Sequence, residues 1–186
     1  MNGRQNAEST SLKFCAWNIC GLKDKLQDKN ILDFILGFDI VWLLETKKYF
    51  NVQVPGFVVY QNVSKEGYHR GGIMMLVKYT ILDCIVQVDT NTEGQIWIVL
   101  EQCGTMKVGG VYIPPEDSPY YDPALYGALA AHTKDFENIL VLGDYNARIG
   151  VPNIVNKNGD PYHSLDIYYC PKRPTLKRSP FTRTVI

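Results

Sequence analysis

The sequence lacks the features that most quickly assign a chain to a membrane-bound or nucleic-acid-binding class. Its 19 basic and 19 acidic residues give a formal net charge of 0, so no overall positive field indicates a nucleic-acid ligand. No apolar run approaches the ~20 residues of a membrane-spanning helix, and residues 1–11 contain no apolar signal core. Internal repeats and low-complexity tracts are also absent from the body of the chain. These absences favour an ordinary soluble domain that does not contact a membrane.

The cysteine patterns of zinc sites and disulfide frameworks are missing as well. The five cysteines form no Cys-x-x-Cys pair, and the three histidines give no zinc-like spacing with them. An odd number of scattered cysteines favours free thiols, and free thiols favour a reducing compartment. We therefore expect a soluble, intracellular protein of the nucleus or the cytoplasm, without a small-molecule cofactor. Its oligomeric state has no signature in the sequence.

The apolar content is sufficient for one domain. The chain has 186 residues, of which 46% are hydrophobic, so it can form one core but hardly two. The pattern predicts a flexible N-terminus at 1–11, a folded domain at 12–150 and an irregular, basic tail at 151–186. In the tail, apolar periodicity is lost among prolines, and basic residues without acidic ones follow Pro171.

Hydrophobic patterning predicts a mixture of strands and helices. Short apolar runs predict strands at 12–17, 39–44, 57–60, 73–77, 81–88, 96–101, 106–113 and 139–142. Asp28 is a suitable N-cap for a helix that Gly37 would end. Asp122-Pro123 would open a second helix that runs to about Phe136. Many strands with few helices indicate an α/β fold with at least two layers.

Polar side chains lie at the ends of four predicted strands. They are Asn18, Glu45, Tyr112 and Asp144, and Asn146 follows two positions after the last of them. Because alternate side chains share one face of a strand, we expect Asp144 and Asn146 to point the same way. Carboxylate and amide oxygens suit Mg²⁺, which can bridge to a substrate phosphate. Tyr112 can donate to charge developing on phosphorus, and Asp144 can orient or deprotonate water.

Each of these residues also has a purely structural explanation. Asn18, Asp144 and Asn146 are typical turn formers, and Glu45 could mark the point where a buried strand meets solvent. Tyr112 could be an interior aromatic whose hydroxyl reaches the surface. Taken singly, these explanations are the better ones. Only the ordered set, with its strand context, indicates a shared site.

Five short segments in a fixed order carry a family resemblance. They are Trp17-Asn18-Ile19-Cys20-Gly21-Leu22, Leu44-Glu45-Thr46, Arg70-Gly71-Gly72-Ile73, Val111-Tyr112-Ile113-Pro114-Pro115 and Gly143-Asp144-Tyr145-Asn146-Ala147-Arg148-Ile149-Gly150. The set resembles the endonuclease/exonuclease/phosphatase superfamily, and most of all the apurinic-endonuclease-like domain of LINE-type (non-LTR) retrotransposons. The resemblance covers roughly residues 12–150. It implies a four-layered α/β sandwich of two packed mixed sheets flanked by helices, incomplete at its C-terminal end.

The resemblance also implies a role for each polar residue. Glu45 would be the principal ligand of a Mg²⁺ ion, for which Mn²⁺ could substitute, and Asn18 would belong to the same metal site. Tyr112 would contact the scissile phosphate. Asp144 would orient the nucleophilic water, and Asn146 would hold both the phosphate and Asp144.

DNA is the partner that the resemblance implies, with Arg70 beside the double glycine as a further substrate-binding residue. Members of this family carry an Asp near a terminal Asp-His pair, whose His contacts the phosphate. This chain has no Asp-His dipeptide, and His163 lies in a different setting with the order reversed. We therefore expect a truncated or diverged copy with impaired activity, which could be a fragment of a larger polyprotein.

Three functions follow as hypotheses. The first is a Mg²⁺-dependent phosphodiesterase that nicks DNA. The second is a catalytically dead remnant that binds nucleic acid or protein. The third is a phosphatase or phosphodiesterase of the same fold that acts on a small phosphate ester. The fold hosts all three and does not decide among them.

Overall fold

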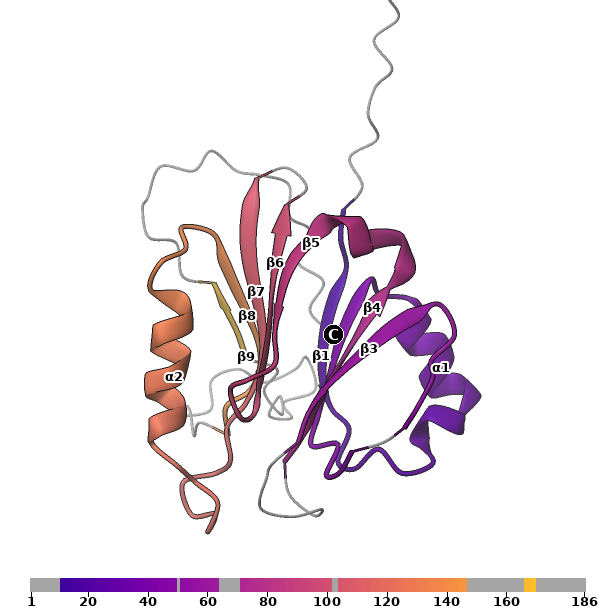
Figure 1. The fold of residues 1–186 in the computed structure, drawn as a ribbon. Coiled ribbons are helices and arrows are strands. Elements are labelled where there is room, and N and C mark those ends of the chain that lie inside the picture. Colours follow the sequence, from indigo (N-terminus) through magenta and orange to yellow (C-terminus); the bar gives the residue numbers. More distant parts are fainter. Residues whose placement is uncertain (1–10, 50, 64–70, 102–103, 147–165, 170–186) are drawn as a thin grey trace, which may run out of the picture.

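The computed structural model describes residues 11–49, 51–63, 71–101, 104–146 and 166–169, the last group by its backbone only. These residues form two β-sheets packed face to face, with one α-helix against the outer face of each sheet (Figure 1). The layer order is therefore helix, sheet, sheet, helix. The predicted four-layered α/β sandwich is confirmed.

The first sheet is mixed and contains the N-terminal strands. Its order is β1-β2-β4-β3, with bounds β1 Phe14–Asn18, β2 Ile40–Leu44, β4 Ile73–Lys78 and β3 Phe57–Asn62. β1 and β2 are parallel, and the other two pairs are antiparallel. Helix α1 (Lys29–Leu36) crosses from β1 to β2, which is the connection that a parallel pair needs.

Helix α1 begins where the sequence predicts. The side chain of Asp28 accepts a hydrogen bond of 2.8 Å from the backbone N–H of Asn30, so Asp28 is the N-cap. Gly37 is the C-cap, although in the right-handed rather than the left-handed conformation. The helix buries Ile35 against the outer face of the first sheet.

The second sheet is also mixed. Its order is β5-β6-β7-β8-β9, with bounds β5 Ile85–Asp89, β6 Gln95–Glu101, β7 Thr105–Tyr112, β8 Ile139–Asp144 and β9 Asp166–Tyr169. Only β7 and β8 are parallel, and helix α2 (Ala124–Thr133) forms the crossover between them. Leu125 and Leu129 of this helix, together with Phe136 beyond its end, pack against the outer face of the sheet.

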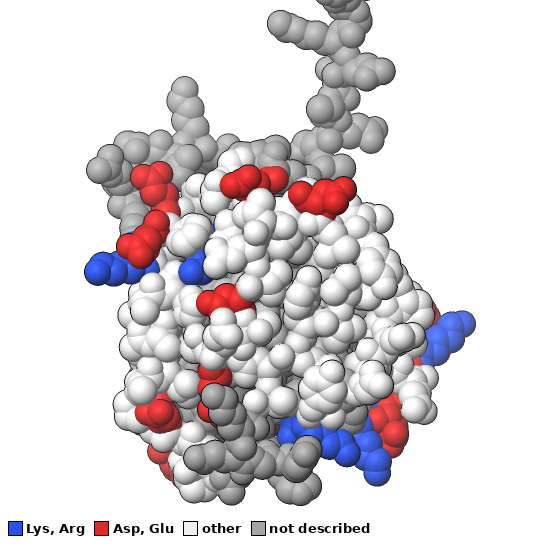
Figure 2. Space-filling view, in the orientation of Figure 1, with Lys and Arg blue, Asp and Glu red and all other residues white. Residues whose placement is uncertain are grey.

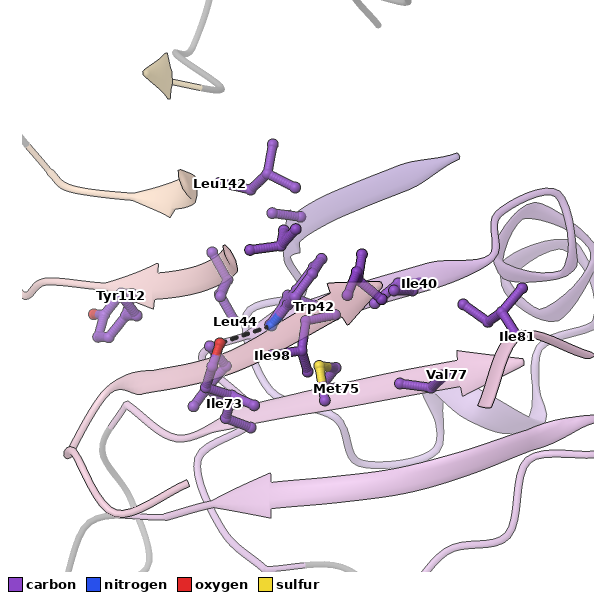
Figure 3. Close-up of a cluster of buried hydrophobic side chains, with 14 residues drawn as sticks. Ile40, Trp42, Leu44, Ile73, Met75, Val77, Ile81, Ile98, Tyr112 and Leu142 are labelled. Atoms are coloured by element: carbon purple, nitrogen blue, oxygen red, sulfur yellow. Dashed lines mark hydrogen bonds between the residues drawn. The ribbon is translucent and has the colours of Figure 1, made fainter. Parts of the chain in front are cut away.

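The main core lies between the two sheets, and β2 explains its pattern. Ile40, Trp42 and Leu44 point into the space between the sheets, as Figure 3 shows, whereas Val41 and Leu43 point toward α1. Because both faces of β2 are buried, its sequence is a continuous apolar run rather than an alternating one. The indole of Trp42 donates a hydrogen bond of 3.1 Å to the carbonyl oxygen of Ile96 in β6, which ties the two sheets together.

The structure differs from the predicted elements at three places. The strand predicted at 81–88 is wrong, because Tyr79–Cys84 form a short 3₁₀ helix (η2) and β5 begins only at Ile85. This segment carries the chain from the first sheet into the second, so it must turn instead of continuing straight.

Helix α2 ends at Thr133, before Phe136. Strand β9 lies in the stretch where the sequence predicts mostly loop, and four residues are too few to give a periodic pattern.

The described residues also show the state of three cysteines and the lengths of the helices. Cys15, Cys20 and Cys84 are free thiols, as the sequence suggests. Within the described residues, no helix has the length and apolar character needed to cross a membrane.

His132 connects helix α2 to the second sheet. Its ring stacks on Trp97 with centroids 4.8 Å apart, its Nε2 lies 3.0 Å from Thr92 Oγ1, and its Nδ1 lies 3.3 Å from Lys107 Nζ. Because Lys107 can only donate, Nδ1 must be the unprotonated nitrogen of a neutral ring. Partial burial and the Lys107 ammonium lower the pKa of His132 below its ordinary value of 6.5, and Asp89 opposes this shift.

We expect this arrangement to make the stability of the protein depend on pH. Above pH 6.5 the ring is neutral in both the folded and the unfolded chain, and the His132 contacts make their full contribution to the free energy of unfolding. As the pH falls below that value the unfolded chain binds the proton first, so stability declines until the pH passes the lowered pKa of the folded state. Urea unfolding at pH 7.5 and 5.5 should show a larger loss for the wild type than for His132→Gln. Equal losses would contradict this reading of the contact.

Candidate functional site

Two parallel strand pairs, one from each sheet, end at the same edge of the sandwich. In the first sheet Asn18 of β1 pairs with Leu44 of β2, so Glu45 follows at that end. In the second sheet Tyr112 of β7 pairs with Asp144 of β8. Strands β1 and β8 approach each other between the sheets. Four polar residues from four strands therefore converge, as the strand-end pattern predicts.

The side-chain amide of Asn18 links the carboxylates of the two sheets. Its Nδ2 donates one hydrogen bond of 2.9 Å to Glu45 Oε1 and another of 2.8 Å to Asp144 Oδ2. All three residues are partly exposed, so a ligand can approach them from solvent. One neutral amide thus holds together two carboxylates that would otherwise repel each other.

Glu45 adopts a backbone conformation that its surroundings must stabilise. Its φ is 55°, in the left-handed region that costs a residue with a side chain about 1–2 kcal/mol. The Glu45 carbonyl accepts a hydrogen bond of 2.7 Å from Gly21 N–H, and Thr46 N–H donates 3.1 Å to the Gly72 carbonyl. A Cβ on Gly72 would lie 2.7 Å from Thr46 Oγ1. Gly72 is therefore needed for the close approach that holds Glu45.

Tyr112 lies beside Glu45 with its ring buried. Burial raises the pKa of Tyr112 well above its ordinary value, and the negative charges of Glu45 and Asp144 raise it further. The hydroxyl therefore stays protonated at any physiological pH and acts as a hydrogen-bond donor.

Asp144 and Asn146 are related by a turn instead of by strand alternation. Strand β8 ends at Asp144, and Asn146 has a φ of 46°. The expectation that both lie on one face of a strand is therefore wrong, because the chain leaves the sheet between them. The backbone N–H of Asn146 donates 3.0 Å to Asp144 Oδ1, and its side-chain amide donates 2.9 Å to the Ile113 carbonyl. This turn orients the second oxygen of Asp144.

Some predicted residues cannot be compared with the structure. Arg70, His163 and the end of the last segment, 147–150, lie outside the described residues.

Three contributions to the site were not expected from the sequence. The backbone N–H of Cys20 donates a hydrogen bond of 3.0 Å to Asn18 Oδ1, and the Ile113 carbonyl accepts one from the side-chain amide of Asn146. These two groups are backbone atoms, which any residue could supply. The third contribution is the side chain of Lys25, which contacts the backbone just after Asn18. Lys25 had no motif or spacing to distinguish it from its neighbours.

The donor set is suitable for a Mg²⁺ ion. Glu45 and Asp144 offer hard carboxylate oxygens, and Asn18 Oδ1 has a second lone pair beyond the one that Cys20 uses. Among the described residues, no group of three or more His, Cys, Asp or Glu side chains surrounds a common point. Mg²⁺ does not need such a cage, because it keeps several waters and binds through one or two carboxylates.

The model of the endonuclease/exonuclease/phosphatase family matches residues 15–166, most of the chain. The chain belongs to this family. Nucleases of the family generally use divalent metal ions, which agrees with the donor set described above. No match was found among curated proteins.

Solved structures of family members share the fold. The AP endonuclease LMAP from Leishmania major has a TM-score of 0.57 at 15% identity, over 72% of this chain and 54% of that one. The Xenopus laevis APE2 catalytic domain has a TM-score of 0.57 at 18% identity, over 73% and 59%. The endonuclease domain of TRAS1, a telomere-specific non-LTR retrotransposon, has a TM-score of 0.51 at 10% identity, over 74% and 60%. The chain thus spans less than two thirds of these structures.

Proposed function

We propose that this chain is a Mg²⁺-dependent phosphodiesterase domain of the retrotransposon-endonuclease type, which nicks DNA. The observation that carries the proposal is the Asn18 amide, which joins Glu45 and Asp144 at 2.9 and 2.8 Å. Two carboxylates gathered by one neutral amide favour the binding of a divalent cation, and their partial exposure makes them accessible from solvent.

Each side chain has a role in the proposed reaction. Glu45 and Asn18 would hold the metal ion, and a bound divalent cation would supply stabilisation of negative charge on the phosphate. Asp144 orients the attacking water and accepts its proton, since Asn18 and Asn146 fix both of its oxygens. The protonated Tyr112 donates a hydrogen bond to the phosphate oxygen that gains charge.

DNA as the substrate is supported by the relatives and by the surface. One solved relative, the D. rerio TDP2 structure, is described as complexed with a single strand DNA product at a TM-score of 0.53. Another is described as the 3′ phosphatase NExo from Neisseria bound to product DNA hairpin, at a TM-score of 0.52. In Figure 2, one group of Lys and Arg side chains lies at the lower right of the molecule, with Asp and Glu side chains beside it. The basic side chains of this group would attract phosphate groups.

We expect this chain on its own to cleave slowly. The family resemblance places a phosphate-contacting His in an Asp-His pair, and the printed sequence has no such dipeptide. The loss of one positioned acid–base group typically lowers the rate by roughly 10²–10⁴-fold. Assays should therefore use protein in excess of DNA and long incubation.

Nicking of supercoiled plasmid tests the proposal. The wild-type chain should convert supercoiled to open-circular DNA with Mg²⁺ or Mn²⁺ and not with EDTA. Glu45→Gln should lose this activity by about 10²-fold or more, because the metal ion loses its principal charged ligand. Glu101→Gln is the matched control. It makes the same change at the exposed end of β6, where Glu101 pairs with Thr105, far from Tyr112.

Two results would contradict the proposal. One is equal nicking by the wild type and Glu45→Gln, which would point to a contaminating nuclease. The other is no nicking by the wild type in either metal, which would favour a catalytically dead remnant.

A further inference from the structure

Lys25 closes the loop that follows β1. It is the first residue of the short 3₁₀ helix η1 (Lys25–Gln27). Its ammonium donates to the backbone carbonyl of Ile19 and, at 3.3 Å, to that of Cys20. Its own backbone N–H donates 3.0 Å to the Leu22 carbonyl. One partly buried cation thus gathers successive carbonyl groups of this loop.

The loop conformation in turn orients Asn18. Cys20 has a φ of 48°, which is unfavourable for a residue with a side chain and needs stabilisation from its surroundings. In this conformation the Cys20 N–H points back at the Asn18 side chain and donates 3.0 Å to its Oδ1. With Oδ1 fixed, the Nδ2 of the same planar amide is directed at Glu45 and Asp144.

We propose that Lys25 is a positioning residue for the candidate site, acting on Asn18 through the backbone of residues 19 and 20. Its ammonium contacts carbonyl oxygens and neither of the two carboxylates. The role in metal binding and cleavage rests on the proposed function, whereas the orientation of Asn18 by the loop does not.

The charge of Lys25 allows the positioning role to be separated from simple electrostatics. A lysine near a metal site repels the metal ion, so removing its charge alone should tighten metal binding. Removing a group that orients the ligands should weaken it, by about tenfold where outer-shell partners have been deleted in metal sites. The two explanations therefore predict opposite signs for the same substitution.

The affinity of the whole chain for Mn²⁺ separates the two explanations. It is measured from the loss of the electron paramagnetic resonance signal of the free ion as Mn²⁺ binds. Lys25→Met should weaken Mn²⁺ binding about tenfold, and Lys25→Arg, which keeps the charge and the donors, should restore most of it. Lys23→Met is the matched control, because Lys23 is an exposed lysine of the same loop. It should leave Mn²⁺ affinity unchanged or slightly increased. Circular dichroism confirms that each variant is folded.

A metal-free readout keeps this proposal apart from the proposed function. In ¹⁵N-correlated spectra without metal, the side-chain amide of Asn18 and the backbone amide of Cys20 should shift in Lys25→Met and stay in place in Lys23→Met. Unchanged signals, or Mn²⁺ binding that tightens in both variants, would overturn the positioning role. If the wild type binds no Mn²⁺ while these signals shift as expected, the proposed function fails and the positioning of Asn18 by Lys25 stands.

Discussion

Replacing Asp144 by Asn is expected to lower single-turnover nicking of plasmid DNA by roughly 10²–10⁴-fold, the size typical of a lost general base. The carboxylate of Asp144 accepts one hydrogen bond on each oxygen, from Asn18 Nδ2 and from the backbone N–H of Asn146. An amide has a single acceptor oxygen, so it cannot accept both at these two positions. It also cannot take a proton from water. The variant therefore loses both the orientation and the basicity of this group.

The control for this prediction is Asp24→Asn. Asp24 is exposed, adopts a φ of 59° that Asn tolerates well, and makes no capping hydrogen bond with its side chain. The substitution removes the same charge without touching the site. Rates measured with excess protein and saturating Mg²⁺ should be unchanged in Asp24→Asn. A loss of less than fivefold in Asp144→Asn would remove Asp144 from the role of base and leave it a structural role in joining the sheets.

The sequence predicts most of the fold because the decisive patterns are local. The continuous apolar run of β2 follows from burial on both faces, and the start of α1 follows from the capping side chain of Asp28. The 3₁₀ helix at Tyr79–Cys84 was missed for the opposite reason. The chain turns here because it passes from the first sheet to the second, and a window of a few residues does not show where that crossing occurs.

For the candidate site, the sequence predicts a list of residues and not a geometry. Asn18 is 27 positions from Glu45 and 126 from Asp144, so only the pairing of strands in two sheets brings them within hydrogen-bonding distance. The strand-end pattern indicated that they share an edge. It did not indicate that a single amide joins the carboxylates, because that depends on how the two sheets are stacked. Backbone donors such as Cys20 N–H follow from loop conformation alone.

The core between the sheets makes a second strong prediction, at Gly110 in β7. A Cβ added at this position would lie 1.9 Å from Cδ1 of Trp42, whose ring fills the space that the glycine leaves. The ring cannot move away freely, because its Nε1 donates to the Ile96 carbonyl and Ile96 pairs with Gly110. Gly110→Ala should therefore destabilise the protein by about 3 kcal/mol, at the upper end of the usual cost of overpacking a core.

The same substitution at Gly127 should have the opposite sign. Gly127 lies on the exposed side of α2, and an added Cβ would meet no atom within 4 Å. In a helix interior, alanine is favoured over glycine by about 0.8–1 kcal/mol. Urea unfolding followed by circular dichroism should thus show a lower midpoint for Gly110→Ala and a higher one for Gly127→Ala. Both variants add one methyl group, so Gly127→Ala is the matched control. A wild-type midpoint for Gly110→Ala would mean that Trp42 repacks at little cost. It would also mean that the hydrogen bond from Trp42 to Ile96 does not hold the sheets in register.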